Sequence, residues 1–237
     1  MDDATTETNP TLRNQLDQPI GARVEQLLPV PPPSTDPMVG RTCIVSRLDA
    51  AAHGSALFDA FDEAPDDGPW TYLFHERSAT VGDFIEWFGR FEGRADPLCF
   101  VISDASGPCG MGSYLRPAPD HGAIEVGGIH LAPRLQGTTA ATEAMYLMMQ
   151  RAFDTGYRRY EWKCDSLNAP SRSAAQRLGF VYEGDFRQAV VYKGRNRDTS
   201  WFSIIDAEWP QLQVEFERWL DPANFDGSGR QRTPLRH

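Results

Sequence analysis

Hydrophobic residues along this chain follow two spacings, and the change from one to the other marks the expected elements. Three apolar-rich runs, 98–103, 109–115 and 123–131, are separated by short segments rich in Gly, Pro and Asp, which predicts three consecutive antiparallel strands. Single strands are expected at 42–45 and 159–164, and a final hairpin is expected from 180–192 and 200–205. The pattern therefore predicts about seven strands.

Helical spacing lies between these strands. Phe84, Trp87, Phe88 and Phe91 place an aromatic stripe on one helix, which Thr80 can cap. Further helices are expected over 50–61, from about 141 to a stop at Gly156, from about 169 to 178, and around 212–219. The order predicts an α/β (α+β) fold, in which helices flank a mixed, mostly antiparallel sheet.

The two ends differ in composition from the body. Residues 1–40 are polar and contain a proline run, Pro31–Pro33, so we expect an extended arm. The alternative is a proline-rich ligand for a partner protein. Residues 221–237 are rich in Gly, Ser and Arg, which predicts a flexible tail. Residues 41–220 are left as one catalytic-sized domain.

Composition narrows the function. The 237 residues carry a net charge of −10, which disfavours binding to nucleic acid or an anionic membrane. The four cysteines form no Cys-x-x-Cys pair and the five histidines show no ligand spacing, so a structural zinc site is not expected. The start is acidic and polar, and no apolar run approaches about 20 residues, so we expect a soluble, cytoplasmic protein.

The segment 129–144 combines the end of a strand, a loop of small residues and the start of a helix. Backbone N–H groups at a helix N-terminus are unpaired and lie at the positive end of the helix dipole. A diphosphate group would fit such a loop, although a plain strand-to-helix connection explains the same residues.

Two motifs resemble the GNAT superfamily of acyl-CoA-dependent N-acyltransferases. Gln136-x-x-Thr139-x-Ala141 is similar to the phosphate loop of that family, with Thr139 replacing the middle glycine. The run 141–144, Ala-Thr-Glu-Ala, and the segment 168–184, with Asn-x-x-Ser, Gly-Phe and Glu-Gly, resemble the ribosomal-protein N-terminal acetyltransferase branch (RimJ/RimL type). Together these motifs and the strand pattern around them cover nearly the whole body.

The resemblance implies acetyl-CoA as acyl donor, no metal, and a homodimer. It also implies that the strands ending at Leu131 and Cys164 are parallel neighbours that part to admit the coenzyme. The cofactor-binding residues implied are His130, Leu131, Gln136, Gly137, Thr138, Thr139, Ala140, Ala141, Asn168 and Ser171. Asn168 is also explained as a helix N-cap.

Direct transfer to an amine requires a base and a proton donor. Glu125 lies 11 residues before Gln136, the offset at which the histone-acetylating branch places its catalytic glutamate. Strand alternation places Glu125, Gly127, Ile129 and Leu131 on one largely apolar face, where a carboxylate binds a proton more readily. A satisfied structural carboxylate is the alternative.

Many GNAT enzymes use a tyrosine as the acid, and its position here is Ala175. Ser171 matches the serine of Asn-x-x-Ser and is the candidate donor, although first-turn capping also explains it. Cys164 has no histidine partner in the pattern, so we assign it to the core.

The early helices and the last hairpin are expected to supply the acceptor pocket. The main candidates are Trp70, Tyr72, Glu125 and Asp198, beside Trp87, Tyr192, Arg197 and Trp201. Aromatic walls with an acidic group suit a cationic amine, but packing and an Arg197–Asp198 ion pair would explain the same residues. The sequence thus predicts acetyl transfer to a primary amine, on a small molecule or a protein N-terminus. A non-catalytic acyl-CoA sensor and an interaction scaffold are the alternatives.

Overall fold

The computed structural model describes residues 12–235, so the acidic first segment of the expected arm lies outside the described residues. An eight-stranded sheet has the order β3-β4-β5-β6-β7-β8-β10-β9, in which only the β7–β8 pair is parallel. Its strands are β3 (Met38–Val39), β4 (Ile44–Arg47), β5 (Leu98–Asp104), β6 (Gly107–Ala118), β7 (Ala123–Leu131), β8 (Arg159–Asp165), β9 (Val181–Tyr192) and β10 (Arg195–Ile205). The expected mixed, mostly antiparallel sheet is confirmed, with β3 as an additional edge strand.

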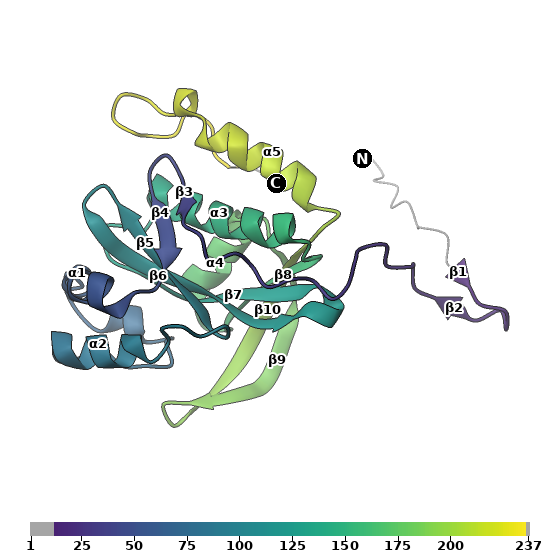
Figure 1. Ribbon diagram of the computed structural model, residues 1–237, viewed down its shortest axis with the longest axis horizontal. Coiled ribbons are helices and arrows are strands. Elements are labelled where there is room, and N and C mark those ends of the chain that lie inside the picture. Colours follow the sequence, from purple (N-terminus) through teal and green to yellow (C-terminus); the bar gives the residue numbers. More distant parts are fainter. Residues whose placement is uncertain (1–11, 236–237) are drawn as a thin grey trace.

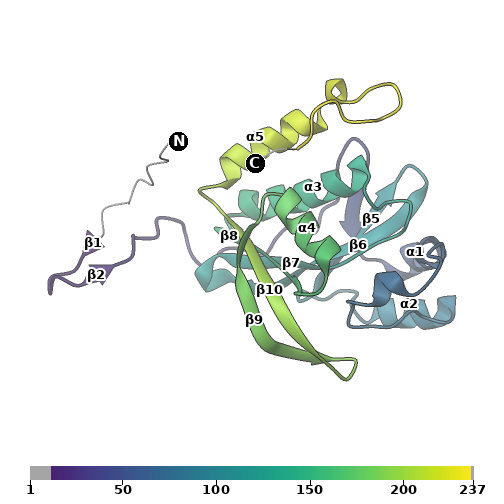
Figure 2. The same ribbon diagram turned by 180° about the vertical axis from the view of Figure 1, so that it is seen from behind.

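Helices cover both faces of this sheet (Figures 1 and 2). The first face carries α1 (Ala50–Asp62) and α2 (Val81–Gly89), which pack on each other and, through α1, on β6. The second face carries α3 (Thr139–Thr155), α4 (Ala169–Arg177) and α5 (Trp209–Leu220). Short 3-10 turns occur at Gly68–Trp70, Pro119–His121 and Pro222–Asn224. None of the helices in the described range is long and apolar enough to span a membrane.

The helix ends follow the local chemistry of the sequence. The Thr80 side chain accepts a hydrogen bond from the Asp83 amide and caps α2, as predicted. Gly156 ends α3 in the left-handed conformation, with φ of 106°. The Asn168 side chain accepts a hydrogen bond from the Ser171 amide, which confirms the predicted capping role.

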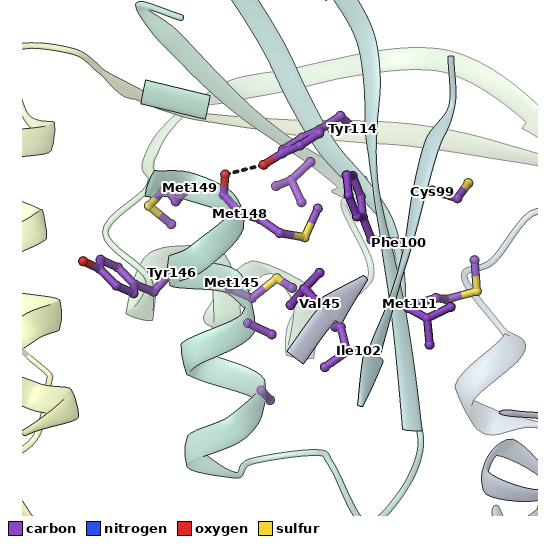
Figure 3. Packing of buried hydrophobic residues seen from close by; sticks show 14 of the residues in the cluster. Val45, Cys99, Phe100, Ile102, Met111, Tyr114, Met145, Tyr146, Met148 and Met149 are labelled. Atoms are coloured by element: carbon purple, nitrogen blue, oxygen red, sulfur yellow. Dashed lines mark hydrogen bonds between the residues drawn. The ribbon is translucent and has the colours of Figure 1, made fainter. Parts of the chain in front are cut away.

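Alternate residues of the central strands separate the two faces (Figure 3). Phe100 and Tyr114 point toward α3, where the Tyr114 hydroxyl donates to the Met148 carbonyl at 2.6 Å. Cys99 and Met111 point toward the α1–α2 side. The main core therefore lies between the sheet and α3, and the other face is left to line a cavity.

A β-bulge in β7 breaks the predicted alternation. Met111 of β6 pairs with His130 of β7, and Ser113 of β6 pairs with Gly127 of β7. Two steps along β6 therefore correspond to three steps along β7, so β7 contains one extra residue. Gly128 adopts a φ of 59°, which favours glycine. Glu125 and His130 consequently face the α1–α2 side together, and the expected shared face of Glu125, Ile129 and Leu131 is wrong.

The arm and the tail both contact the body. β1 (Leu12–Arg13) and β2 (Pro19–Ile20) form a separate two-stranded hairpin that extends from the body (Figure 1). Val30 is buried and its amide donates to the Pro119 carbonyl, whereas Leu27 is 93% exposed. In the tail, the Asn224 side chain bonds to the carbonyls of Trp219 and Thr233. The domain boundaries remain predictions.

Candidate active site

The site begins where β7 and β8 part. Their parallel pairing runs from Ala123 opposite Arg159 to Val126 opposite Trp162 and stops there. Both strands continue, β7 to Leu131 and β8 to Asp165, without pairing to each other. The bulge at Gly127–Gly128 begins at the last paired row and turns β7 away. The predicted parting of these two strands is therefore confirmed.

A cavity of about 610 Å³ occupies this opening. Side chains from both faces of the sheet line it, because the parted strands leave a passage between the faces. Its wall includes Tyr72, Phe74, His75 and Trp87 from the α1–α2 side, Met111, Ser113 and Arg116 from β6, Glu125 and 126–129 from β7, 162–165 from β8, Asn168 and Ser171 from α4, and Phe186, Arg197, Thr199 and Trp201 from the hairpin.

The loop before α3 presents backbone donors. Thr138 caps the helix: its hydroxyl oxygen accepts from the Ala141 amide at 3.2 Å and its proton goes to the Leu135 carbonyl. The amides of Gly137, Thr139 and Ala140 have no hydrogen-bond partner within residues 12–235. Gly137 has a φ of 71°, and a Cβ there would meet nothing within 4 Å. This arrangement suits an anion at the positive end of α3.

The neighbouring residues complete the loop. Gln136 is exposed, and its side-chain amide donates to the Leu131 carbonyl at 2.9 Å. Thr139 is the first residue of α3 and has no positive φ, so the replacement of glycine at this position causes no strain. The sequence-predicted loop residues therefore lie together at the helix N-terminus.

Glu125 lies in the cavity wall among charges. Its carboxylate forms ion pairs with Lys163 Nζ at 2.9 Å and with Arg116, although the Glu125 side chain is only 4% exposed. Lys163 also pairs with Glu161 at 2.8 Å. The expected apolar surroundings of Glu125 are thus wrong, because β6 and β8 on either side each contribute a cation.

Ser171 lies on the α4 side of the cavity. Its Oγ accepts a hydrogen bond from the Trp162 indole N–H at 3.0 Å. The Ser171 hydroxyl can also donate its own proton, and the nearby Cys164 sulfur is one acceptor for it. Burial raises the pKa of the nearby Cys164 thiol, with Ser171 as a hydrogen-bond partner that acts in the opposite direction. A protonated, buried thiol is a poor nucleophile, in agreement with the assignment of Cys164 to the core.

Two histidines lie on the α1–α2 side, His130 buried and His75 half-buried. His130 stacks on Phe61 with ring centroids 3.9 Å apart and meets the edge of Trp70. Burial lowers the pKa of His130 to about 3. Burial, aided by the charge of Lys193, lowers the pKa of His75 to about 4. Both imidazoles are neutral near pH 7.

The predicted acceptor residues divide into two groups. Tyr72 and Glu125 line the cavity, and the Tyr72 hydroxyl donates to the Leu167 carbonyl at 3.1 Å. Trp70 is buried outside the wall against His130, and Asp198 lies at a separate surface depression with Gln188 and Asn196. The Arg197–Asp198 ion pair, the alternative explanation of these residues, is absent among the described residues, because Asp198 accepts from the Gln188 amide and the Asn196 side chain instead.

Two cavity residues had no role in the sequence analysis. Lys163 lies 3.6 Å from the centroid of the Trp201 ring and bridges Glu125 and Glu161. Arg116 reaches Glu125 from β6. The sequence shows that Glu161, Lys163 and Asp165 alternate along one strand, which places them on one face. It does not show that this face lies beside Glu125.

Comparison with known proteins agrees with this geometry. Residues 47–181 match the model of the acetyltransferase (GNAT) domain family. No curated protein matches the chain. Among solved structures, a GCN5-related N-acetyltransferase from Brucella melitensis is 43% identical, with a TM-score of 0.87, over 90% of this chain and 97% of that one. A probable GNAT-family acetyltransferase from Chromobacterium violaceum is 40% identical, with a TM-score of 0.68, over 75% and 94% of the two chains.

A more distant neighbour extends the likeness of fold. It is an acetyltransferase from Salmonella typhimurium described as modifying the N-terminal serine of ribosomal protein L7/L12, and it is 20% identical with a TM-score of 0.60, over 70% of this chain and 96% of that one. At this identity the likeness concerns the fold alone. With the family match over more than half of its length and two relatives at or above 40% identity, this chain belongs to the GNAT acetyltransferase family.

Proposed function

We propose that this protein transfers an acetyl group from acetyl-CoA to a primary amine by direct attack within a ternary complex. The cavity that passes between the parted ends of β7 and β8 carries this proposal. It gives an extended thioester access from the α3–α4 side and an amine access from the α1–α2 side. Holding the two reactants in this orientation supplies much of the rate enhancement.

The coenzyme would use main-chain groups. The free amides of Gly137, Thr139 and Ala140 at the start of α3 suit its diphosphate. The exposed edge of β7 at His130 and Leu131 would bind the pantetheine arm as an added strand, and Asn168 would approach it from α4. Acetyl-CoA supplies the activated acetyl group, and this chemistry requires no metal.

Glu125 is the proposed base. Its carboxylate lines the cavity beside Lys163 and Arg116, where it would accept the proton of the incoming amine. Ser171 is the proposed donor to the departing thiolate, because its hydroxyl lies in the cavity wall and is oriented by the hydrogen bond from Trp162. The acceptor, a small-molecule amine or a protein N-terminus as in the RimJ/RimL-type branch, contacts Tyr72 and Glu125.

Binding and turnover are tested separately. Calorimetry should detect saturable acetyl-CoA binding at submillimolar concentration, and a panel of amines and peptide N-termini should gain the mass of one acetyl group. Acetyl-CoA that binds but is never consumed would contradict the enzymatic proposal and indicate a sensor. Absence of binding would contradict both.

Two variants test the roles. Glu125→Gln should lower kcat by at least about 10-fold across pH 6 to 9, whereas Glu161→Gln, which alters a contact of the same Lys163 outside the cavity wall, should not. Ser171→Ala should lower kcat similarly, with the exposed neighbour Ser173→Ala as control. Unchanged kcat in either active-site variant would reject the role of that residue.

A further inference from the structure

Arg197 places a buried guanidinium in the cavity wall. The residue is 7% exposed, and its Nε donates to Thr199 Oγ1 at 3.2 Å. Its guanidinium carbon lies 5.2 Å from the centroid of the Phe74 ring and 5.8 Å from that of Tyr192. Between residues 12 and 235, no carboxylate oxygen lies within 4 Å of it, and its two terminal nitrogens donate to no protein acceptor.

The carboxylates nearby are otherwise engaged. Glu125 pairs with Lys163 and Arg116. Asp165, on the strand beside Arg197, accepts from the Tyr192 hydroxyl at 2.8 Å and from the Leu167 amide at 2.9 Å. The charged groups of the wall are thus three cations, Arg116, Lys163 and Arg197, against two carboxylates. Among the described residues, Arg116 and Lys163 each contact a carboxylate within 4 Å, whereas Arg197 does not.

A buried arginine cannot lose its proton and is unfavourable without an anion. The diphosphate of the coenzyme does not meet this need, because its proposed site is the start of α3 on the second face of the sheet. Arg197 instead contacts Phe74, in the segment between α1 and α2, on the side from which the acceptor enters.

We propose that Arg197 binds a carboxylate of the acceptor, so that the substrate is a primary amine that also carries a carboxylate. This inference rests on the proposed function and narrows its substrate class. The planar fork of Arg197 fits a carboxylate with two parallel hydrogen bonds, and the rings of Phe74 and Tyr192 lie beside the guanidinium. A free amino acid and a peptide with an acidic first residue present the same chemistry.

Matched amines test the proposal. Each carboxylate-bearing amine is paired with its neutral counterpart: glycine with glycinamide, 5-aminopentanoate with pentylamine, and peptides beginning with Asp with those beginning with Asn. We expect kcat/KM to favour the carboxylate of at least one pair by about 10- to 100-fold, the range of a charged hydrogen-bonded pair. The small-molecule pairs and the peptide pair distinguish the two sources.

Variants assign that preference to Arg197. Arg197→Met should abolish the preference and leave the KM for acetyl-CoA unchanged, and Arg197→Lys, which keeps the charge but not the fork, should retain part of it. Arg195→Met removes an exposed arginine from the same strand and should keep the parent's preference. If Arg197→Met does not fold, the test rests on the parent's ratio of kcat/KM within each pair and on the reduction of that ratio in Arg197→Lys.

A direct binding measurement completes the test. Calorimetry on the CoA-saturated protein, with N-acetyl-5-aminopentanoate and N-pentylacetamide as probes, should show tighter binding of the carboxylate. The proposal would be overturned if kcat/KM favoured the carboxylate in none of the pairs, or if the two probes bound equally well. It would also be overturned if Arg197→Met lowered kcat/KM equally for both amines of a pair. Efficient acetylation of neutral amines alone would overturn it and leave the proposed acetyltransferase function intact.

Discussion

Glu143, on the second turn of α3, anchors the start of the sheet. Its buried carboxylate accepts hydrogen bonds from the Arg41 amide at 2.8 Å, from the Thr42 amide at 2.6 Å and from the Thr42 hydroxyl. Gly40 approaches so closely that a Cβ there would lie 2.6 Å from the Glu143 side chain. The turn between β3 and β4 is therefore held by one carboxylate of α3, a helix far away in the sequence but adjacent in the fold.

Glu143→Gln changes this anchor with little change of volume. The amide has only one oxygen, so at least one of the backbone N–H groups of Arg41 and Thr42 faces an NH₂ group and loses its acceptor. An unsatisfied buried donor costs about 1–3 kcal/mol, and the remaining bonds lose their charge assistance, about 0.5–1 kcal/mol each. We expect the free energy of unfolding to fall by about 2–4 kcal/mol.

Urea unfolding followed by circular dichroism and tryptophan fluorescence measures this change. With unchanged m, the midpoint should fall by about 1 M or more. Glu86→Gln is the control, because Glu86 is exposed and forms a surface ion pair with Arg90, whose loss should cost less than about 0.5 kcal/mol. A Glu143→Gln variant as stable as Glu86→Gln would refute the anchoring role.

Three further changes test other features. Burial lowers the pKa of His130 in the folded protein, so on acidification this histidine is protonated in the unfolded chain at a higher pH than in the folded one. The free energy of unfolding therefore falls as the pH falls from about 6.5 toward 3, by about 2 kcal/mol between about pH 6.5 and 5. His130→Phe should remove this loss, which urea titrations at the two pH values measure. An equal pH dependence in the variant would contradict this. Gly128→Ala should lower the free energy of unfolding by about 1–2 kcal/mol because of the positive φ at the bulge, whereas Gly82→Ala, in the first turn of α2, should be neutral or stabilising. Thermal unfolding compares the two variants, and equal melting temperatures would show that the bulge tolerates a side chain. Lys163→Met leaves Glu125 without one of its two cations and should lower the free energy of unfolding, measured in urea, by about 3 kcal/mol. A loss below about 1 kcal/mol would show that Arg116 alone is enough to compensate the buried Glu125 carboxylate.

Much of the fold follows from local sequence rules. The aromatic stripe of α2 and its Thr80 cap, the Gly156 stop of α3 and the Asn168 cap of α4 all depend on residues within a few positions of each other. Turn-rich segments separate the central strands, so their antiparallel order could be predicted as well. β3 could not, because its two residues directly follow Pro37 and pair only through contacts with β4.

The loop proposed to bind the coenzyme could be located from the sequence for the same reason. The loop and the helix start form one continuous segment, and the small residues there indicate a close approach by a ligand. The cavity wall proposed for the acceptor could not be, because segments far apart in the sequence build it. Trp70 and Asp198 have the residue types of an acceptor pocket, but tertiary packing places Trp70 behind His130 and Asp198 outside the cavity.

The bulge in β7 shows how a local deviation decides the chemistry of the site. Regular alternation from Glu125 would have turned His130 toward α3, and the parted end of β7 would have kept the direction of the paired rows. One extra residue at Gly127–Gly128 brings His130 onto the face of Glu125 and turns β7 away from β8 at the last paired row, Val126 with Trp162. Two adjacent glycines within an apolar strand are the sequence signal of such a bulge. The same two residues therefore lie where β7 and β8 part and place Glu125 and His130 on one face of the sheet.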